Sequence, residues 1–361
     1  MNEIDIECLK REERAALKLK DLYRRYGYDE YKLSGFEDYS LYADNKSFLD
    51  GKGVLSFSVG GKMLALRPDV TLSVIKNVNT SAISDPVKLF YDEHVYRKTS
   101  GGGDFAELRQ IGVEVIGRVD TVTETEVCGL VLKTLLSVTD GRYVIDVSHA
   151  GIIEKALNKL GDNGRPVRKK AAEYLMSKNA HDFLRFAAAN GINKIYADAF
   201  CALITIPCER ESAVNSLAPF SEILDIGNEL DELNDVLSAV GEHACVNFSI
   251  GGDADYYNRV VFKGYVEGVP YAVLSGGRYD KLLGRFGKSA EAIGFALYLG
   301  EICNYYNDEP LKPDAVVVYN DRSAKNASIQ AERLRDKGMR VRVVGNADGY
   351  DCKIFCAEDD I

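Results

Sequence analysis

The chain has 361 residues, of which 45 are Lys or Arg and 55 are Asp or Glu, so its formal net charge at pH 7 is -10. Hydrophobic residues make up 46% and charged residues 28%, which is ordinary for a globular protein and excludes a largely disordered chain. The acidic balance argues against a non-specific polyphosphate binder, because no basic excess is present to release counterions, although a local basic groove remains compatible with it. The length predicts two or three domains.

The eight cysteines lie far apart and contain no Cys-x-x-Cys pair, and none of the four histidines has zinc-ligand spacing. We therefore expect reduced, buried thiols and no metal site. The residues after Met1 are not a basic segment followed by an apolar run, and nowhere do about 18 apolar residues follow one another. Neither a signal peptide nor a membrane span is expected, and the prediction is a cytoplasmic protein.

The first 150 residues mix helix and strand patterns. Gly60-Gly61 between two apolar runs is the signature of a two-residue hairpin turn, and Thr123-x-x-Glu126 is a capping box that indicates the start of a helix. In chain order we expect a helix over 8–27, strands over 54–59, 62–66, 87–97 and 107–117, a loop at 100–103, a helix from 123 to about 136 and a strand over 143–147.

The pattern is helical from about residue 150 to about residue 240. Its clearest part alternates steps of three and four residues, which predicts a narrow apolar stripe on one helix, formed by Ile223, Ile226, Leu230, Leu233, Leu237 and Val240. Later elements are expected as strands over 244–250, 259–266 and 270–275, a helix over 290–306, and a strand, a helix and two strands over 315–319, 323–337, 340–344 and 353–356. This is a mostly antiparallel α+β domain with a helical insertion and a small α/β appendage.

Polar residues alternate along the strand predicted over 107–117. Gln110, Gly112 and Glu114 share one face, while Ile111 and its alternate neighbours share the other. Taken alone, this pattern fits the wet face of a half-buried strand. A glycine within a strand often marks the close approach of a ligand, which favours a binding face instead.

Five motifs follow one another along the chain. They are Leu66-Arg67-Pro68-Asp69-Val70-Thr71, then Tyr96-Arg97 with Gln110-x-Gly112-x-Glu114-x-x-Gly117, then Asp255-Tyr256-Tyr257-Asn258-x-x-x-Phe262, then Gly276-Gly277-Arg278-Tyr279-Asp280, then Gly294-Phe295-Ala296. In this order they resemble the catalytic core of class II histidyl-tRNA synthetases, over about residues 8–306 and including the helical insertion of that family. The resemblance implies a six- or seven-stranded antiparallel sheet flanked by helices, and a homodimer.

The resemblance also implies a histidine pocket and a domain division. Asp69, Thr71 and Gln110 would hold the α-ammonium of histidine. Glu114 and Tyr257, with Tyr279 nearby, would hold its imidazole, because a ring with two nitrogens is best fixed by a partner at each nitrogen. The implied histidine-binding set is Asp69, Thr71, Gln110, Glu114, Tyr256, Tyr257 and Tyr279, with Arg97 and Arg278 as candidate anion contacts. Residues 1–310 would form the synthetase-like core with its insertion at about 150–240, and residues 311–361 a truncated, anticodon-binding-domain-like α/β appendage.

The chain departs from the synthetases at positions that serve ATP. An Arg three residues before the Asp-Tyr-Tyr is here Gly252, an Arg seven residues beyond the Gly of Gly-Phe-Ala is Glu301, and a Glu two residues after the second-motif Arg is Thr99. The first-motif Pro is Ser34. Losing one preorganised donor to a developing anion costs about 3–4 kcal/mol, so two independent losses would slow adenylation about 10⁴-fold or more. We expect no catalytic residues.

A core that keeps the amino-acid pocket and loses these arginines resembles the regulatory subunits of ATP phosphoribosyltransferase. The resemblance implies a non-catalytic subunit that acts with the short-form catalytic subunit in the first step of histidine biosynthesis and senses histidine for feedback control. It implies a homodimer within a hetero-octamer, with no cofactor, tRNA or membrane as partner. The alternative is a divergent histidyl-tRNA synthetase or a paralogue that activates another carboxylate, and a ligand-free scaffold is a third hypothesis.

Overall fold

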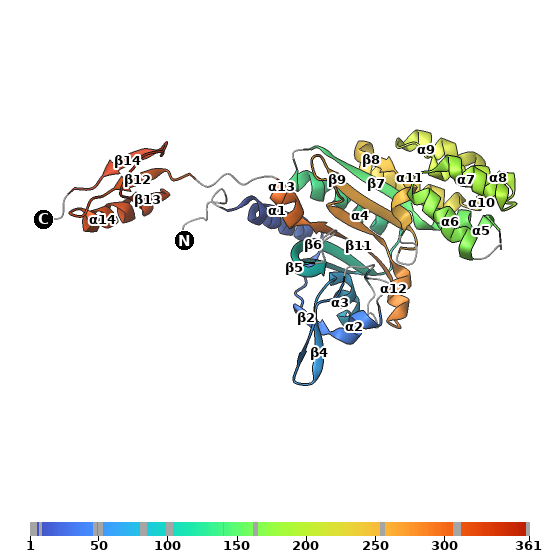
Figure 1. The fold of residues 1–361 in the computed structure, drawn as a ribbon, viewed down its shortest axis with the longest axis horizontal. Helices are drawn as coiled ribbons and strands as arrows, with labels where there is room; N and C mark the ends of the chain where they lie inside the picture. The colour runs from blue at the N-terminus through green and yellow to red at the C-terminus, as the bar shows by residue number, and fades with distance from the viewer. Residues whose placement is uncertain are drawn as a thin grey trace. The chain divides into compact units, whose positions relative to one another are not determined.

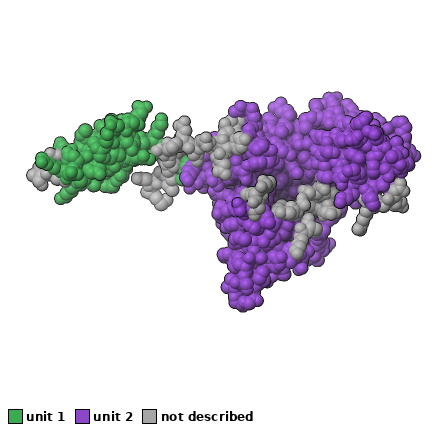
Figure 2. Space-filling model, in the orientation of Figure 1, with its two compact units in different colours: residues 1–9, 307–361 green, residues 10–306 purple. Residues whose placement is uncertain are grey.

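The computed structural model describes residues 6, 9–45, 49, 53–79, 85–98, 104–139, 141–161, 165–252, 257–305 and 312–358. The chain divides into two compact units (Figure 1 and Figure 2): unit 1 comprises residues 1–9 and 307–361, and unit 2 comprises residues 10–306. Among the described residues, no helix has the length and apolar character that a membrane span requires.

Unit 2 is built on an eight-stranded sheet, as counted over the described residues. Its six inner strands are antiparallel neighbours, whereas the edge strands β1 and β8 pair parallel with β5 and β7. The fold class is as predicted. The edge strand β1, which has two residues, was not predicted, and β8 is shorter than the strand expected over 244–250. The parallel pairing of both edges corrects the expected all-antiparallel sheet of six or seven strands. In sheet order the strands are β1 (Asp29–Glu30), β5 (Val87–Lys98), β6 (Phe105–Gly117), β11 (Glu291–Tyr298), β10 (Leu274–Arg278), β9 (Val260–Val266), β7 (Tyr143–His149) and β8 (Ala244–Val246).

One face of this sheet packs against α1 (Arg11–Arg25) and α4 (Thr121–Val138), with α13 (Leu299–Tyr305) beside them. The core there contains Tyr23 of α1, Val131 of α4 and Val113 of β6, each fully buried. The alternation predicted along β6 is confirmed. The capping box at Thr123 is wrong, because α4 begins two residues earlier and the Asp120 carboxylate caps it by accepting from the Thr123 amide at 3.0 Å.

Strand β11 corrects the predicted helix over 290–306, of which only Leu299–Tyr305 is helical. Ala292, Gly294 and Ala296 face one side of the sheet and alternate with larger apolar residues on the other. Because both faces are covered, the strand lacks polar positions, and periodicity alone does not separate such a run from a buried helix.

The opposite face of the sheet carries a second core with a smaller sheet. The hairpin predicted around Gly60-Gly61 is confirmed, and both glycines have positive φ, as a type I′ turn requires. Tyr91 of β5 and Tyr279 are buried in this core. Its elements are β2 (Phe36–Asp38), α2 (Tyr39–Ala43), β3 (Ser56–Val59), β4 (Lys62–Leu66), α3 (Val70–Asn77) and α12 (Asp280–Arg285), with sheet order β2-β4-β3.

The predicted helical insertion gathers at one end of unit 2 in Figure 1. The single striped helix expected from residue 223 onward is interrupted, because Asp225 has a φ of 57° and ends one helix before the next begins. Within the insertion, Cys208 is joined by a disulfide to Cys245 of β8, which corrects the expectation of reduced thiols at these two positions, while the other cysteines whose side chains are described are free. The two cysteines are 37 positions apart, so their spacing gave no signal. The helices are α5 (Ala150–Lys159), α6 (Arg165–Met176), α7 (Ala180–Ala189), α8 (Lys194–Ile204), α9 (Arg210–Leu217), η3 (Ala218–Phe220), α10 (Ser221–Leu224) and α11 (Gly227–Val240), followed by η4 (Gly241–His243) and, after β8, η5 (Phe248–Gly252).

Over the residues that the structure describes, unit 1 contains a three-stranded parallel sheet with one α-helix. Val317 of its central strand packs against Ala327 and Ala331 of the helix. The predicted order of strand, helix and two strands is confirmed as β12 (Ala315–Val318), α14 (Ala324–Arg335), β13 (Val341–Val344) and β14 (Lys353–Cys356), with sheet order β13-β12-β14.

Candidate functional site

Two glycines form the floor of the candidate site on the central strands. Glu114 of β6 lies opposite Gly294 of β11, which in turn lies opposite Gly277 of β10. A Cβ atom at position 294 would lie 1.9 Å from Glu114 Oε2, and one at position 277 would lie 2.7 Å from Cδ1 of Tyr257. Only glycine at positions 294 and 277 leaves room for the side chains of Glu114 and Tyr257 over these strands.

The Glu114 carboxylate is the buried centre of the site. Its side chain is 1% exposed; Oε1 accepts from Thr71 Oγ1 at 2.7 Å and Oε2 accepts from the Tyr279 hydroxyl. Burial raises the pKa of this carboxyl to about 8, although the two hydrogen bonds act in the opposite direction. Glu114 is therefore mostly protonated at neutral pH, and it can share a proton with a basic ring nitrogen.

A second cluster joins the start of α3 to the end of β5. The Asp69 carboxylate caps α3 by accepting from the Leu72 amide at 3.1 Å, and its other oxygen lies 3.4 Å from Nη2 of Arg97. Arg97 also donates to the carbonyl of Pro68 at 2.6 Å and to the Tyr298 hydroxyl at 2.8 Å. The cluster places a carboxylate and a guanidinium side by side at the N-terminus of the helix that carries Thr71.

Gln110 lies on the same face of β6 as Glu114, opposite Tyr298 of β11. Its side chain is 2% exposed and forms no hydrogen bond with the described residues. A buried amide without such a partner is available to a ligand.

The predicted tyrosines have different positions. Tyr279 is buried and bonded to Glu114, whereas Tyr257 is half-buried over Gly277 and packs against Ile250 and Val261. Tyr256 lies outside the described residues. The structure thus joins Thr71, Glu114 and Tyr279 directly, pairs Asp69 with Arg97, and puts Gln110 and Tyr257 over the same sheet face.

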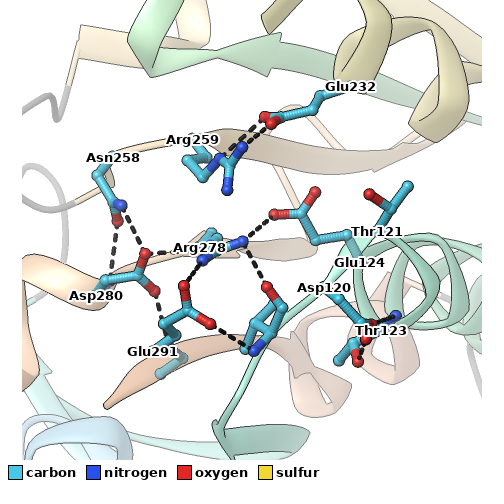
Figure 3. A network of polar contacts seen from close by, with 12 residues as sticks. Asp120, Thr121, Thr123, Glu124, Glu232, Asn258, Arg259, Arg278, Asp280 and Glu291 are labelled. Carbon is cyan, nitrogen blue, oxygen red and sulfur yellow. Dashed lines mark hydrogen bonds and ion pairs between the residues drawn. The ribbon is translucent and has the colours of Figure 1, made fainter. Parts of the chain in front are cut away.

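Arg278 does not belong to this cluster. Its guanidinium donates to Glu124 at 2.7 Å, to Asp280 at 2.8 Å, to Glu291 and to the carbonyl of Val119 (Figure 3). Its side chain is 2% exposed and its donors are occupied by three carboxylates. The prediction of an anion contact at Arg278 therefore has no support from the geometry. Arg278 and Tyr279 are adjacent in the motif, but adjacent residues of an extended chain point to opposite faces of the sheet.

Sequence reasoning missed Tyr91. This residue lies opposite Gly112, and a Cβ atom there would be 2.6 Å from the Tyr91 hydroxyl oxygen, so the glycine predicted to admit a ligand admits the Tyr91 ring. The hydroxyl forms no hydrogen bond with the described residues, and Tyr91 is 1% exposed. The available signal was its distance of six positions from Arg97, an even number that puts both residues on one face of β5.

The two positions that lack the synthetase arginines differ in setting. Glu301 lies on α13 and accepts a hydrogen bond from the Tyr271 hydroxyl. Gly252 ends the short helix η5. Thr99 lies outside the described residues. Neither of the two described positions supplies a cation to the site.

Comparisons with known proteins agree on the family. The family model described as "Histidyl-tRNA synthetase" matches residues 1–302. An ATP phosphoribosyltransferase regulatory subunit of Caldanaerobacter subterraneus subsp. tengcongensis is 30% identical over 94% of this chain and 92% of its own length.

Solved structures share the fold. A crystal structure of an ATP phosphoribosyltransferase regulatory subunit/histidyl-tRNA synthetase from Bacillus halodurans has a TM-score of 0.79 at 22% identity, covering 99% of this chain and 96% of its own. A chain of the ATP phosphoribosyl transferase (HisG:HisZ) complex from Thermotoga maritima has a TM-score of 0.62 at 15% identity, covering 80% of this chain and 97% of its own.

Proposed function

The chain belongs to the histidyl-tRNA synthetase family, in its branch of ATP phosphoribosyltransferase regulatory subunits, and from this premise we propose that it binds free histidine and controls a catalytic ATP phosphoribosyltransferase subunit. The observation that carries the proposal is the buried Glu114 carboxylate, held between Thr71 and Tyr279 over a glycine floor, in a chain without the ATP-binding arginines.

The imidazole is the part of histidine that Glu114 recognises. A carboxyl held by two hydroxyl donors keeps one orientation, so it can meet a ring nitrogen with little cost of ordering. Tyr257, which lies over Gly277, would contact the ring from the neighbouring strands. A contact from Tyr256 stays a prediction.

The ammonium and carboxylate groups of the ligand would meet the second cluster. Asp69, Thr71 and Gln110 offer oxygen acceptors for the α-ammonium. Arg97 lies beside Asp69 and would contact the α-carboxylate, which keeps the charges of the bound zwitterion paired. The anion contact in this proposal rests on Arg97 alone.

Adenylation and tRNA charging are not part of the proposal. A carboxylate about 4 Å from a phosphate oxygen repels it by about 4 kcal/mol at an effective dielectric of 20, so Glu301 opposes ATP binding where the synthetases place a cation. Gly252 offers no side chain to stabilise an activated carboxyl. Retention of the amino-acid pocket without these groups supports a ligand sensor.

The proposed assembly is a homodimer within a hetero-octamer with the short-form catalytic subunit. The ATP phosphoribosyl transferase (HisG:HisZ) complex from Thermotoga maritima pairs two kinds of subunit, which supports a catalytic partner. Histidine would act by binding one state of the assembly better than another, with a coupling free energy of about 1–3 kcal/mol.

Calorimetric titration with histidine tests the pocket. We expect binding by the wild-type chain, a large loss of affinity in Glu114→Ala and a smaller loss in Tyr257→Phe. Tyr319→Phe, which removes an exposed hydroxyl in unit 1, is the matched control and should bind normally. A wild-type chain that produces no binding heat would overturn the proposal.

Two assays test the role in catalysis. The chain should co-purify with a short-form catalytic subunit and change its activity in a histidine-dependent manner. Histidine-dependent exchange between ATP and pyrophosphate should be absent; clear exchange would favour the divergent synthetase instead.

A further inference from the structure

The loop that carries Tyr257 and the turn that carries Tyr279 are tied together by one reciprocal pair. Nδ2 of Asn258 donates to Asp280 Oδ2 at 2.8 Å, and the backbone amide of Asp280 donates to Oδ1 of Asn258 at 2.8 Å (Figure 3). The backbone amide of Asn258 also donates to the carbonyl of Arg278 at 3.0 Å. Each partner in this pair directly follows one of the two tyrosines.

The Asp280 carboxylate also contacts β11, the strand that carries Gly294. Oδ1 of Asp280 accepts from the Ala292 amide at 2.9 Å, and the carbonyl of Ala292 accepts from the Tyr279 amide at 2.8 Å. Ala292 is two residues from Gly294, so it faces the same side of β11. Asp280 therefore connects the Tyr257 loop, the Tyr279 turn and the strand beneath Glu114.

From these contacts we propose that Asp280 and Asn258 are positioning residues of the histidine pocket, which set the two tyrosines relative to Glu114 without contacting the ligand. The inference rests on the proposed function. Hydrogen bonds from the side chain of one residue to the backbone of the other fix a loop more narrowly than packing does, and a displacement of about 1 Å can cost about 100-fold in a site that needs defined geometry.

The substitution Asp280→Asn tests this inference because it preserves the size of the side chain but replaces one of its two acceptor oxygens by an NH₂ donor. The introduced amide must turn its NH₂ group either toward the donors of Asn258 and Arg278 or toward the Ala292 amide, so one donor faces another in both orientations. We expect histidine affinity to fall about 10-fold or more. Hydrogen exchange of the segment around Asn258 should become faster, because its amide loses the fixed position opposite Arg278.

A reversed pair and a matched control separate positioning from stability. Asn258→Asp combined with Asp280→Asn restores both hydrogen bonds between the two positions, but leaves Nε of Arg278 without the Asp280 carboxylate. This double variant should recover histidine affinity while remaining less stable than wild type. Glu291→Gln weakens another bond of the same arginine, and should lower stability while leaving affinity within about twofold.

The results distinguish the inference from the proposed function. Normal histidine binding by Asp280→Asn, failure of the reversed pair to recover affinity, or an equal loss in Glu291→Gln would each overturn the positioning role and leave the histidine pocket intact. Absence of binding by the wild-type chain would overturn the proposed function, and the positioning role with it.

Discussion

Gly294 lies directly opposite Glu114 across the β6–β11 pair, and a Cβ atom at position 294 would lie 1.9 Å from Glu114 Oε2 and 2.4 Å from the carbonyl oxygen of Val113. The Glu114 carboxylate, which we propose for imidazole recognition, can therefore take this orientation only because Gly294 on β11 has no side chain. The carbonyl belongs to the backbone and cannot move aside as a flexible side chain can.

Gly294→Ala should consequently damage both fold and pocket. We expect the free energy of unfolding to fall by about 1–3 kcal/mol, since overpacking in a rigid region costs about that much, and histidine binding to be lost. Urea unfolding and calorimetry measure the two effects. Gly129→Ala is the control, because nothing lies within 4 Å of that position on α4 and alanine favours a helix. A variant at position 294 as stable as wild type would contradict the described geometry.

The titration of Glu114 should make the unliganded protein less stable as the pH rises from about 4.5 to about 8. The pKa of this carboxyl is about 8 in the folded chain against an ordinary value of 4.5, so the folded state binds more protons than the unfolded state in this range. The loss reaches at most about 1.4 kcal/mol per pH unit. Glu114→Gln does not titrate, so the difference in unfolding free energy between it and wild type should change with pH; a constant difference would contradict the raised pKa.

Histidine affinity should be highest between about pH 6.5 and 8. Below pH 8 Glu114 brings a proton, and above about pH 6.5 the free imidazole is neutral. We expect the complex to hold one proton between the Glu114 carboxyl and the imidazole ring. Above this pH window neither free group carries that proton, so binding takes one up; below the window both carry a proton, so binding releases one. Calorimetry in two buffers with different ionisation enthalpies measures the exchange. Proton uptake in the middle of the window would argue against a shared proton.

Tyr91→Phe should weaken histidine binding about 3- to 10-fold, because Tyr91 lies on the site face and its hydroxyl forms no hydrogen bond with the described residues. Stability should change little, since no hydrogen bond of the unliganded chain is lost. Tyr143→Phe removes a buried hydroxyl that has no hydrogen-bond partner among the described residues. Tyr143 lies on β7, away from the described site, so this substitution should not affect binding. Equal effects in both variants would remove Tyr91 from the pocket.

The disulfide between Cys208 and Cys245 should stabilise the junction of the insertion with β8. Replacing both cysteines by alanine is expected to lower the free energy of unfolding by about 2–4 kcal/mol, the range typical of such a cross-link. Alkylation without reductant should label two fewer thiols than alkylation after reduction. Equal labelling under both conditions would show that the bond is absent in solution.

Local patterns were sufficient for much of the fold. The alternation along β6 separated the core face from the face of Gln110 and Glu114, and the Gly-Gly turn was identified from two residues. Strand β11 was mistaken for a helix because both of its faces are covered by protein, which removes the polar positions from which a strand is recognised.

The family, most of the elements and the residue types available to the pocket could be read from the sequence. Which of these residues meet depends on the packing of distant parts of the chain. Tyr279 and Glu114 are 165 positions apart and share a hydrogen bond, whereas Arg278, one residue before Tyr279, is bound within three carboxylates on the other side of its strand. This difference arises because successive side chains of a strand point to opposite faces, and the partner on each face comes from a distant part of the chain.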